Sequence, residues 1–128
     1  MMRAYLGIKY HDDYRNGQLI EEILEILEGK GYETSCIVKD CQLRREFCVN
    51  PTDLMKETFK RIGSCDLVVI EFSEKGVGLG IEAGYAFARG IQVVTIAEEG
   101  SQVSETLEGI SRRVIKYRSL DELRDVKF

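Results

Sequence analysis

One stretch of the sequence combines several glycines with an acidic residue. Gly76, Gly78 and Gly80 precede Glu82 in the run Gly-Val-Gly-Leu-Gly-Ile-Glu, and Gly84 follows it. Glycine lets a backbone approach a ligand closely, and the start of a helix offers unpaired N–H groups at the positive end of a dipole. We therefore expect a polar ligand to bind here, beside a helix that starts at Gly80.

Three interpretations fit this glycine-rich stretch. The spacing Gly78-x-Gly80-x-x-x-Gly84 approximates a dinucleotide phosphate-binding fingerprint, although Glu82 would repel a pyrophosphate in the same turn. Alternatively, Glu82 is a nucleophile that attacks carbon, because a carboxylate in a first helical turn is held ionised by the dipole and by N–H donors. In the third interpretation the glycines only let a helix pack closely on a strand, and Glu82 only complements the dipole. Spacing alone does not choose among them.

The elements that must position these residues alternate between strands and helices. We expect strands at 3–10, 32–38, 67–70, 92–97 and 114–117, and helices at about 19–27, 51–64, 81–89, 104–110 and 119–126. This alternation is typical of a parallel sheet with helices on both faces, and the run 67–70, apolar on both faces, fits its middle strand. The prediction is one α/β domain over residues 1–128, with about five parallel strands in a flavodoxin-like or Rossmann-like fold. Its site should lie beyond the first and third strands.

Composition argues against several other classes of protein. Eighteen basic and 22 acidic side chains leave a net charge of −4, which disfavours binding to a nucleic acid polymer. No apolar run approaches the roughly 20 residues that cross a bilayer, and the first residues do not resemble a signal peptide, so we expect a cytoplasmic protein without membrane contact. Four cysteines without a Cys-x-x-Cys pair and a single histidine predict reduced, partly buried thiols and no metal site.

Four segments in the same order along the chain match one known family. They are Tyr-Leu-Gly at 5–7, Ser-Cys-Asp-Leu-Val-Val-Ile at 64–70, Gly-Val-Gly-Leu-Gly-Ile-Glu-Ala-Gly-Tyr-Ala at 76–86 and Val-Ser-Glu-Thr-Leu-Glu-Gly at 103–109. Together they resemble the nucleoside 2-deoxyribosyltransferase family, including relatives that hydrolyse deoxynucleoside 5'-monophosphates. The resemblance implies an enzyme that acts on a small-molecule nucleoside or nucleotide without a metal or organic cofactor. It also implies a homodimer or higher homo-oligomer with a shared active site.

The resemblance assigns roles to particular residues. Glu82 would attack the anomeric carbon of a 2-deoxyribose and form a covalent glycosyl-enzyme, which a second base or water would then resolve. Tyr5 would position Glu82 or the sugar, although core packing also explains a tyrosine there. Ser104 would reach the 5' end of the substrate from a neighbouring subunit, or would simply cap a helix. The remaining substrate-binding candidates are Gly7, Lys9, Gly76, Gly78 and Gly80.

The sequence departs from the family pattern at three places. Thr58 replaces an aspartate that contacts the base, and Gly76 replaces the aspartate or serine that separates nucleoside-using from phosphate-using members. In the first loop, Ile-Lys-Tyr-His at 8–11 replaces a Gly-Ser-x-Arg pattern, which leaves Lys9 and Lys75 as cations. We hypothesise a phosphorylated substrate, because an ammonium near the 5' end is useful chiefly for an anion. The alternative function, favoured by Thr58 and Gly76, is a nucleotide-binding or sensing module without catalysis.

Two further titratable residues lie in loops or at strand ends near the expected site. His11 follows the first strand and could act as an acid near the base, although a histidine in a polar loop is often inert. Glu71 ends the third strand and points either into the expected crevice or behind it. The sequence does not show in which of these two directions Glu71 points.

Overall fold

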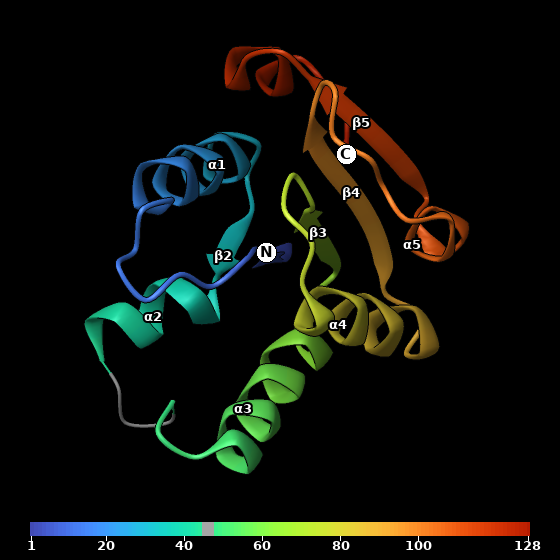
Figure 1. The fold of residues 1–128 in the computed structure, drawn as a ribbon. Helices are drawn as coiled ribbons and strands as arrows, with labels where there is room; N and C mark the ends of the chain where they lie inside the picture. The colour runs from blue at the N-terminus through green and yellow to red at the C-terminus, as the bar shows by residue number, and fades with distance from the viewer. Residues whose placement is uncertain (45–47) are drawn as a thin grey trace.

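The computed structural model describes residues 1–44 and 48–128, which form a parallel sheet with helices on both faces (Figure 1). The strands lie in the order β2-β1-β3-β4-β5, and every pair is parallel. Their bounds are β1 Arg3–Gly7, β2 Glu33–Ser35, β3 Leu67–Glu71, β4 Gln92–Glu98 and β5 Arg113–Tyr117. All residues of β3 are buried. The predicted five-stranded α/β fold with β3 in the middle is therefore confirmed.

The helices form two layers. Their bounds are α1 Gly17–Gly29, α2 Ile37–Leu43, α3 Pro51–Gly63, α4 Val77–Ala88, α5 Glu105–Ile110 and the short 3-10 helix η1 Leu120–Arg124. Helix α1 packs beside η1 on one face of the sheet, whereas α4 packs between α3 and α5 on the other (Figure 1). None of the helices among the described residues is both long enough and apolar enough to span a membrane.

Helix α3 begins where the sequence predicts. The side-chain oxygen of Asn50 accepts hydrogen bonds from the backbone N–H groups of Thr52 and Asp53, and Pro51 occupies the first helical position. An asparagine cap satisfies N–H groups that have no partner within the helix, and proline has no N–H to lose there. This cap fixes the point at which α3 enters the wall of the site.

The structure corrects the expected element boundaries around the site. The sequence predicts a strand over 32–38, but β2 ends at Ser35 and α2 begins at Ile37. Helix α2 forms because Ile37, Val38 and Cys41 share one buried face. The sequence also predicts that the helix over 81–89 starts near Gly80, whereas α4 starts at Val77. At the C-terminal end, η1 replaces the expected α-helix over 119–126.

The cysteines also differ from the prediction. Cys41 and Cys48 form a disulfide, so they are not reduced thiols. Helix α2 brings the two Cα atoms to 5.8 Å, within the range that a disulfide requires. Cys36 and Cys65 are free and buried, as the sequence predicts. Within residues 1–44 and 48–128, no group of three or more His, Cys, Asp or Glu side chains is placed to hold a metal ion.

Candidate active site

A cavity of about 640 Å³ opens beyond the carboxyl ends of the central strands. Its volume lies within the range of small-molecule sites. Backbone and side chains after β1, on α2, at the start of α3 and at the start of α4 enclose it. The lining residues include Ile8, Lys9, Tyr10, Ile37, Val38, Cys41, Cys48, Val49, Leu54, Met55, Thr58, Gly76, Val77, Gly78, Leu79 and Glu82. The predicted location of the site, beyond the first and third strands, agrees with this cavity.

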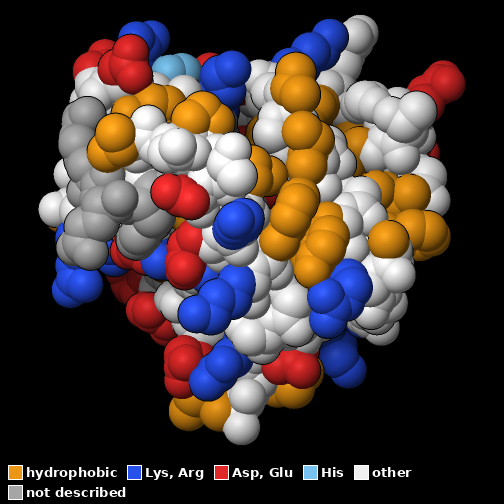
Figure 2. Space-filling view, turned by 90° about the horizontal axis from the view of Figure 1, so that it is seen from below, with side chains coloured by type: hydrophobic (Ala, Val, Ile, Leu, Met, Phe, Trp, Pro, Cys, Tyr) orange, Lys and Arg blue, Asp and Glu red, His pale blue; other side chains and the backbone are white. Residues whose placement is uncertain are grey.

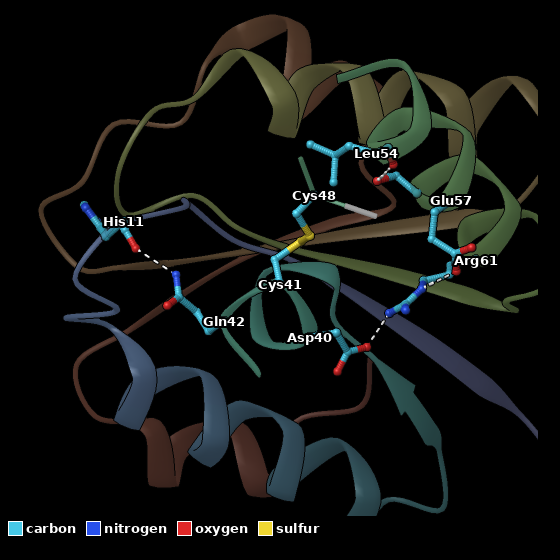
Figure 3. Close-up of a disulfide and its surroundings, with 9 residues drawn as sticks. His11, Asp40, Cys41, Gln42, Cys48, Leu54, Glu57 and Arg61 are labelled. Carbon is cyan, nitrogen blue, oxygen red and sulfur yellow. Dashed lines mark hydrogen bonds and ion pairs between the residues drawn. A yellow bond between two sulfur atoms is a disulfide. The ribbon is translucent and has the colours of Figure 1, made fainter. Parts of the chain in front are cut away.

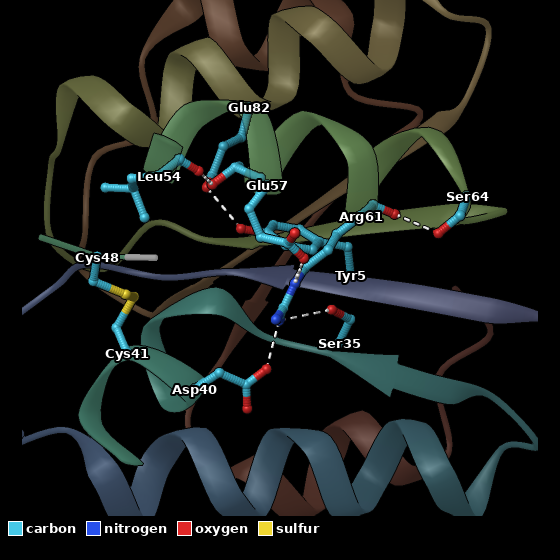
Figure 4. A network of polar contacts seen from close by, with 11 residues as sticks. Tyr5, Ser35, Asp40, Cys41, Cys48, Leu54, Glu57, Arg61, Ser64 and Glu82 are labelled. Atoms are coloured by element: carbon cyan, nitrogen blue, oxygen red, sulfur yellow. Dashed lines mark hydrogen bonds and ion pairs between the residues drawn. A yellow bond between two sulfur atoms is a disulfide. The ribbon is translucent and has the colours of Figure 1, made fainter. Parts of the chain in front are cut away.

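Glu82 lines the cavity and hydrogen-bonds to Tyr5. The hydroxyl of Tyr5 donates to Oε2 of Glu82 over 2.8 Å, across 77 positions of sequence (Figure 4). Tyr5 is fully buried in β1, and the Glu82 residue is 8% exposed. Because α4 starts at Val77, Glu82 lies in its second turn, and the expected place in a first turn is wrong. The hydrogen bond from Tyr5 on β1 therefore orients the Glu82 side chain at the cavity, and a helix cap does not.

Burial controls the protonation of this pair. Removal from water raises the pKa of the Glu82 carboxyl to about 7, and the hydrogen bond from Tyr5 opposes part of this rise. Burial, followed by the charge of Glu82, raises the pKa of the Tyr5 hydroxyl well above its usual value. The expectation that a helix dipole holds Glu82 firmly ionised is therefore wrong. At neutral pH the carboxyl exists in both protonation states, while Tyr5 remains a proton donor.

Gly7 makes room for the Glu82 carboxyl. A β-carbon at Gly7 would lie 2.6 Å from Oε1 of Glu82 and 2.9 Å from Cδ1 of Ile70. Both distances are shorter than van der Waals contact, so an additional carbon would displace one of these side chains. The sequence assigns Gly7 to substrate binding, and the structure places it behind the carboxyl.

The cavity lining also includes Lys9 and the start of α4. Lys9 is half-buried, and a β-carbon at Gly76 would lie 3.5 Å from its Cδ. The side chain of Asn16 donates a hydrogen bond to the backbone oxygen of Lys9 and so holds the loop after β1. Gly76 and Gly78 line the cavity as predicted, but Gly80 does not. A lysine beside the positive end of a helix is an arrangement that attracts anions.

His11 and Lys75 do not line this cavity. Nε2 of His11 lies 3.0 Å from the Glu74 carboxylate, and Gln42 donates to the backbone oxygen of His11 (Figure 3). His11 thus connects the loop after β1 to the loop before α4 and to α2. His11 therefore connects these loops from outside the cavity lining, and its role as an acid near the base stays a prediction.

Glu71 belongs to a second buried tyrosine–glutamate pair. Its carboxylate accepts hydrogen bonds from the Tyr117 hydroxyl and from the N–H and hydroxyl of Ser73. Glu71 does not line the cavity, so the ambiguity about its direction is resolved. Ser104 also lies outside the cavity and caps α5 by accepting from the N–H of Leu107. Its predicted contact with a substrate in a neighbouring subunit stays a prediction.

An arginine-centred network joins elements that enclose the cavity, and the sequence does not predict it as a whole. Arg61 on α3 donates to Glu57, Asp40 and Ser35, and so joins α3 to α2 and to β2 (Figure 4). The spacing of Glu57 and Arg61, four residues apart on one helix, is a signal for one of these contacts. Nothing in the sequence indicates the contact with Asp40, because it depends on the unpredicted helix α2. The network holds two walls of the cavity together.

The chain resembles proteins that act on N-glycosidic bonds. It is 28% identical over 127 residues to "Putative 2'-deoxynucleoside 5'-phosphate N-hydrolase 1" of Thermofilum pendens, covering 94% of this chain and 89% of that protein. A CMP N-glycosidase of Clostridium botulinum superimposes with a TM-score of 0.67 at 22% identity, covering 94% and 93% of the two chains. A 2-deoxyribosyltransferase of Bacillus psychrosaccharolyticus gives 0.78 at 12% identity, covering 98% and 93%. No family model matches the chain.

These comparisons confirm three expectations drawn from the sequence. The resemblance to the nucleoside 2-deoxyribosyltransferase family is confirmed, and the similarity is to enzymes, as predicted. The structural likeness covers nearly the whole described fold and confirms its type.

Proposed function

We propose that the protein cleaves or transfers the N-glycosidic bond of a 2-deoxyribonucleoside or its 5'-monophosphate, with Glu82 as the nucleophile. The observation that carries this proposal is the hydrogen bond from Tyr5 to a buried glutamate that lines a nucleotide-sized cavity. The resemblance to N-glycosidases and deoxyribosyltransferases supports the same reaction. We also propose that residues 1–128 act as one nucleoside 2-deoxyribosyltransferase-like domain.

The proposed reaction has two displacements at the anomeric carbon. An oxygen of ionised Glu82 forms a bond to that carbon while the bond to the base nitrogen breaks, and the base takes the electron pair and a proton. Water or a second base then displaces Glu82 from the sugar, restoring the carboxylate. Tyr5 holds Oε2, so Oε1 is left to attack. Positive charge developing on the sugar is stabilised at short range by the carboxylate.

The cavity's electrostatics favour a phosphorylated substrate. The cavity lining contains Lys9 and the first turn of α4, which attract an anion, and it also contains the acidic side chain of Glu82. A 5'-phosphate beside Lys9 would place the sugar between the two groups. The base would then face the largely apolar wall formed by Ile37, Val38, Leu54 and Met55, with the hydroxyl of Thr58 among them.

We also propose that the protein is a homodimer or a higher homo-oligomer. Helix α4 exposes the apolar side chains of Val77, Ile81 and Phe87, and hydrophobic side chains gather on the face viewed in Figure 2. The resemblance implies a site shared between subunits, with Ser104 contributed by the neighbour. Sedimentation equilibrium of the purified protein tests this proposal. The cytoplasmic location stays a prediction.

A panel assay tests the proposed reaction. Deoxynucleosides and their 5'-monophosphates are incubated with the protein, with and without an added free base, and base release and exchange are followed by chromatography. Release without an added base indicates a hydrolase, and exchange that requires the second base indicates a transferase. Binding without release or exchange would instead support the alternative function, a catalytically inactive nucleotide-binding or sensing module, which the replacement by Thr58 and Gly76 favours.

A matched pair of variants identifies the reacting carboxyl. Glu82→Gln keeps the shape of the side chain but removes the attacking oxygen anion, so base release and exchange should be lost. Glu71→Gln alters the other buried carboxyl, which does not line the cavity, and should leave the reaction in place in the folded protein. Full turnover in Glu82→Gln would refute the proposed mechanism.

A further inference from the structure

The Cys41–Cys48 disulfide joins two walls of the cavity. Cys41 lies on α2, and Cys48 lies two residues before Asn50, which caps α3. Figure 3 shows the bridge passing between α2 and the side of the cavity that carries Leu54. Both cysteines line the same cavity as Glu82. The bridge is therefore part of the surface that a substrate would meet.

The disulfide restrains the cavity wall formed by α2 and α3, and not the elements that carry Tyr5 and Glu82. Tyr5 and Glu82 are carried by β1 and α4, neither of which contains a half of the disulfide. The wall that the bridge fixes consists of apolar side chains on α2 and α3, among them Ile37, Val38 and Leu54. A change in the bridge should therefore alter how tightly a substrate is held more than how fast the bond breaks.

A second connection would keep the two helices together without the disulfide. Arg61 on α3 forms an ion pair with Asp40 on α2 and donates to Ser35, and none of these three residues lines the cavity (Figure 4). Asp40 and Cys41 are neighbours on α2, so the ion pair and the bridge restrain the same turn. Opening the bridge would loosen the wall locally while the fold is retained.

The two halves of the bridge differ in exposure. Cys41 is 7% exposed, whereas Cys48 is half-buried and faces the open cavity. Because Cys48 is the more exposed half, we expect a small thiol in the cavity to attack the sulfur of Cys48. Burial raises the pKa of the free thiols, that of Cys36 to about 12, so they are poor competitors for exchange.

We propose that Cys41–Cys48 is a thiol-exchange site whose redox state sets the affinity of the cavity for its nucleotide substrate. The thiolate of a low-molecular-weight dithiol or monothiol bonds to Sγ of Cys48, the Sγ–Sγ bond breaks, and Cys41 leaves with the electron pair and takes a proton. A second thiolate displaces Cys48 from the mixed disulfide. Two external thiols are oxidised to a disulfide, and the protein bridge is reduced to two thiols. This inference rests on the proposed function for its substrate.

The experiment compares the wild-type protein after equilibration with oxidised or reduced dithiothreitol, with peptide mapping to establish the state of Cys41 and Cys48. Reduction should raise the KM for the deoxynucleoside monophosphate by about three- to tenfold, because wall side chains must then be ordered on binding, while kcat changes by less than about twofold. The double variant Cys41→Ser, Cys48→Ser should behave as the reduced protein under both conditions. Cys65→Ser, at a buried free thiol outside the cavity, is the matched control and should keep the redox response.

Two results would overturn the inference. One is an unchanged KM in protein whose bridge is shown to be fully reduced, and the other is the absence of a Cys41–Cys48 bridge in the oxidised protein. A failure of the proposed function can be told apart from a failure of this inference, because the Glu82→Gln variant and the base-release assay test the proposed function separately. If no base is released, calorimetric affinity for the same monophosphates replaces KM, and equal affinities in the two redox states refute the inference.

Discussion

Gly7 and Glu82 fit together so closely that a single methyl group on β1 would collide with the carboxyl. A β-carbon at Gly7 would lie 2.6 Å from Oε1, the oxygen that Tyr5 does not hold. Strand β1 thus contributes the hydroxyl of Tyr5 and, at Gly7, the space that the Glu82 carboxyl needs. The orientation of Glu82 depends on both contributions.

Gly7→Ala should therefore impair the reaction without unfolding the protein. Displacement of the carboxyl by even an ångström should lower kcat/KM by about 100-fold. Gly29→Ala is the control, because a β-carbon there meets nothing within 4 Å and the residue lies on α1, away from the cavity. Base-release kinetics and far-UV circular dichroism of both variants test the prediction. Equal activity of Gly7→Ala and the wild type would contradict it.

The buried Glu82 carboxyl should make stability depend on pH. Its pKa is raised in the folded protein from about 4.5 to about 7, so the folded state favours the protonated form. The corresponding stabilisation is present below pH 4.5 and is lost as pH rises through about 7, a change of about 3 kcal/mol in the free energy of unfolding. Urea unfolding of the wild type and Glu82→Gln over this range measures the difference. Parallel curves for the two proteins would show that Glu82 does not titrate in this way.

Tyr5→Phe should move the pH dependence of the reaction. The Tyr5 hydroxyl lowers the pKa of Glu82, so its removal should shift the rising limb of the rate profile to higher pH. Tyr117→Phe is the matched control, because it deletes the hydroxyl that donates to Glu71 outside the cavity. That variant should lose about 1–3 kcal/mol of stability and keep the position of the limb. The prediction is tested by pH–rate profiles of both variants and the wild type with one substrate. It would be refuted if the rising limb of Tyr5→Phe coincided with that of the wild type.

Lys9→Met should discriminate between phosphorylated and unphosphorylated substrates. Loss of a charge-assisted hydrogen bond should raise the KM for a 5'-monophosphate about 10- to 100-fold and leave that for the deoxynucleoside nearly unchanged. Lys75→Met provides the control, because Lys75 is exposed and does not line the cavity. If Lys9→Met weakens both substrates equally, or if the wild type prefers deoxynucleosides, the phosphate hypothesis is wrong.

The sheet was predictable because its strands have strong local signals. Residues 67–70 are apolar on both faces, and Asn50-Pro51 marks the start of α3, so these elements follow from short segments of sequence. Helix α2 was missed because it is short and begins with the β-branched pair Ile37-Val38, which favours a strand. The early start of α4 was missed because Gly78 and Gly80 are poor helix formers.

The place of Glu82 beside a cavity was predictable, but its chemical environment was not. The glycine-rich segment and the family resemblance both indicate Glu82, while its protonation depends on burial by residues far away in the sequence. The disulfide shows the same limit. Cys41 lies on α2, a helix that the sequence does not predict, so the spacing of Cys41 and Cys48 alone carries no signal for their disulfide.

The position of Glu82 in the second turn of α4 makes the length of the preceding segment critical. Each residue of an α-helix advances the side-chain direction by about 100°, so one inserted or deleted residue between Val77 and Glu82 would rotate the carboxyl onto another side of the helix. Exchanges of residue type within this segment would therefore preserve the direction of Glu82, whereas a change in the number of residues would turn the carboxyl away from the cavity.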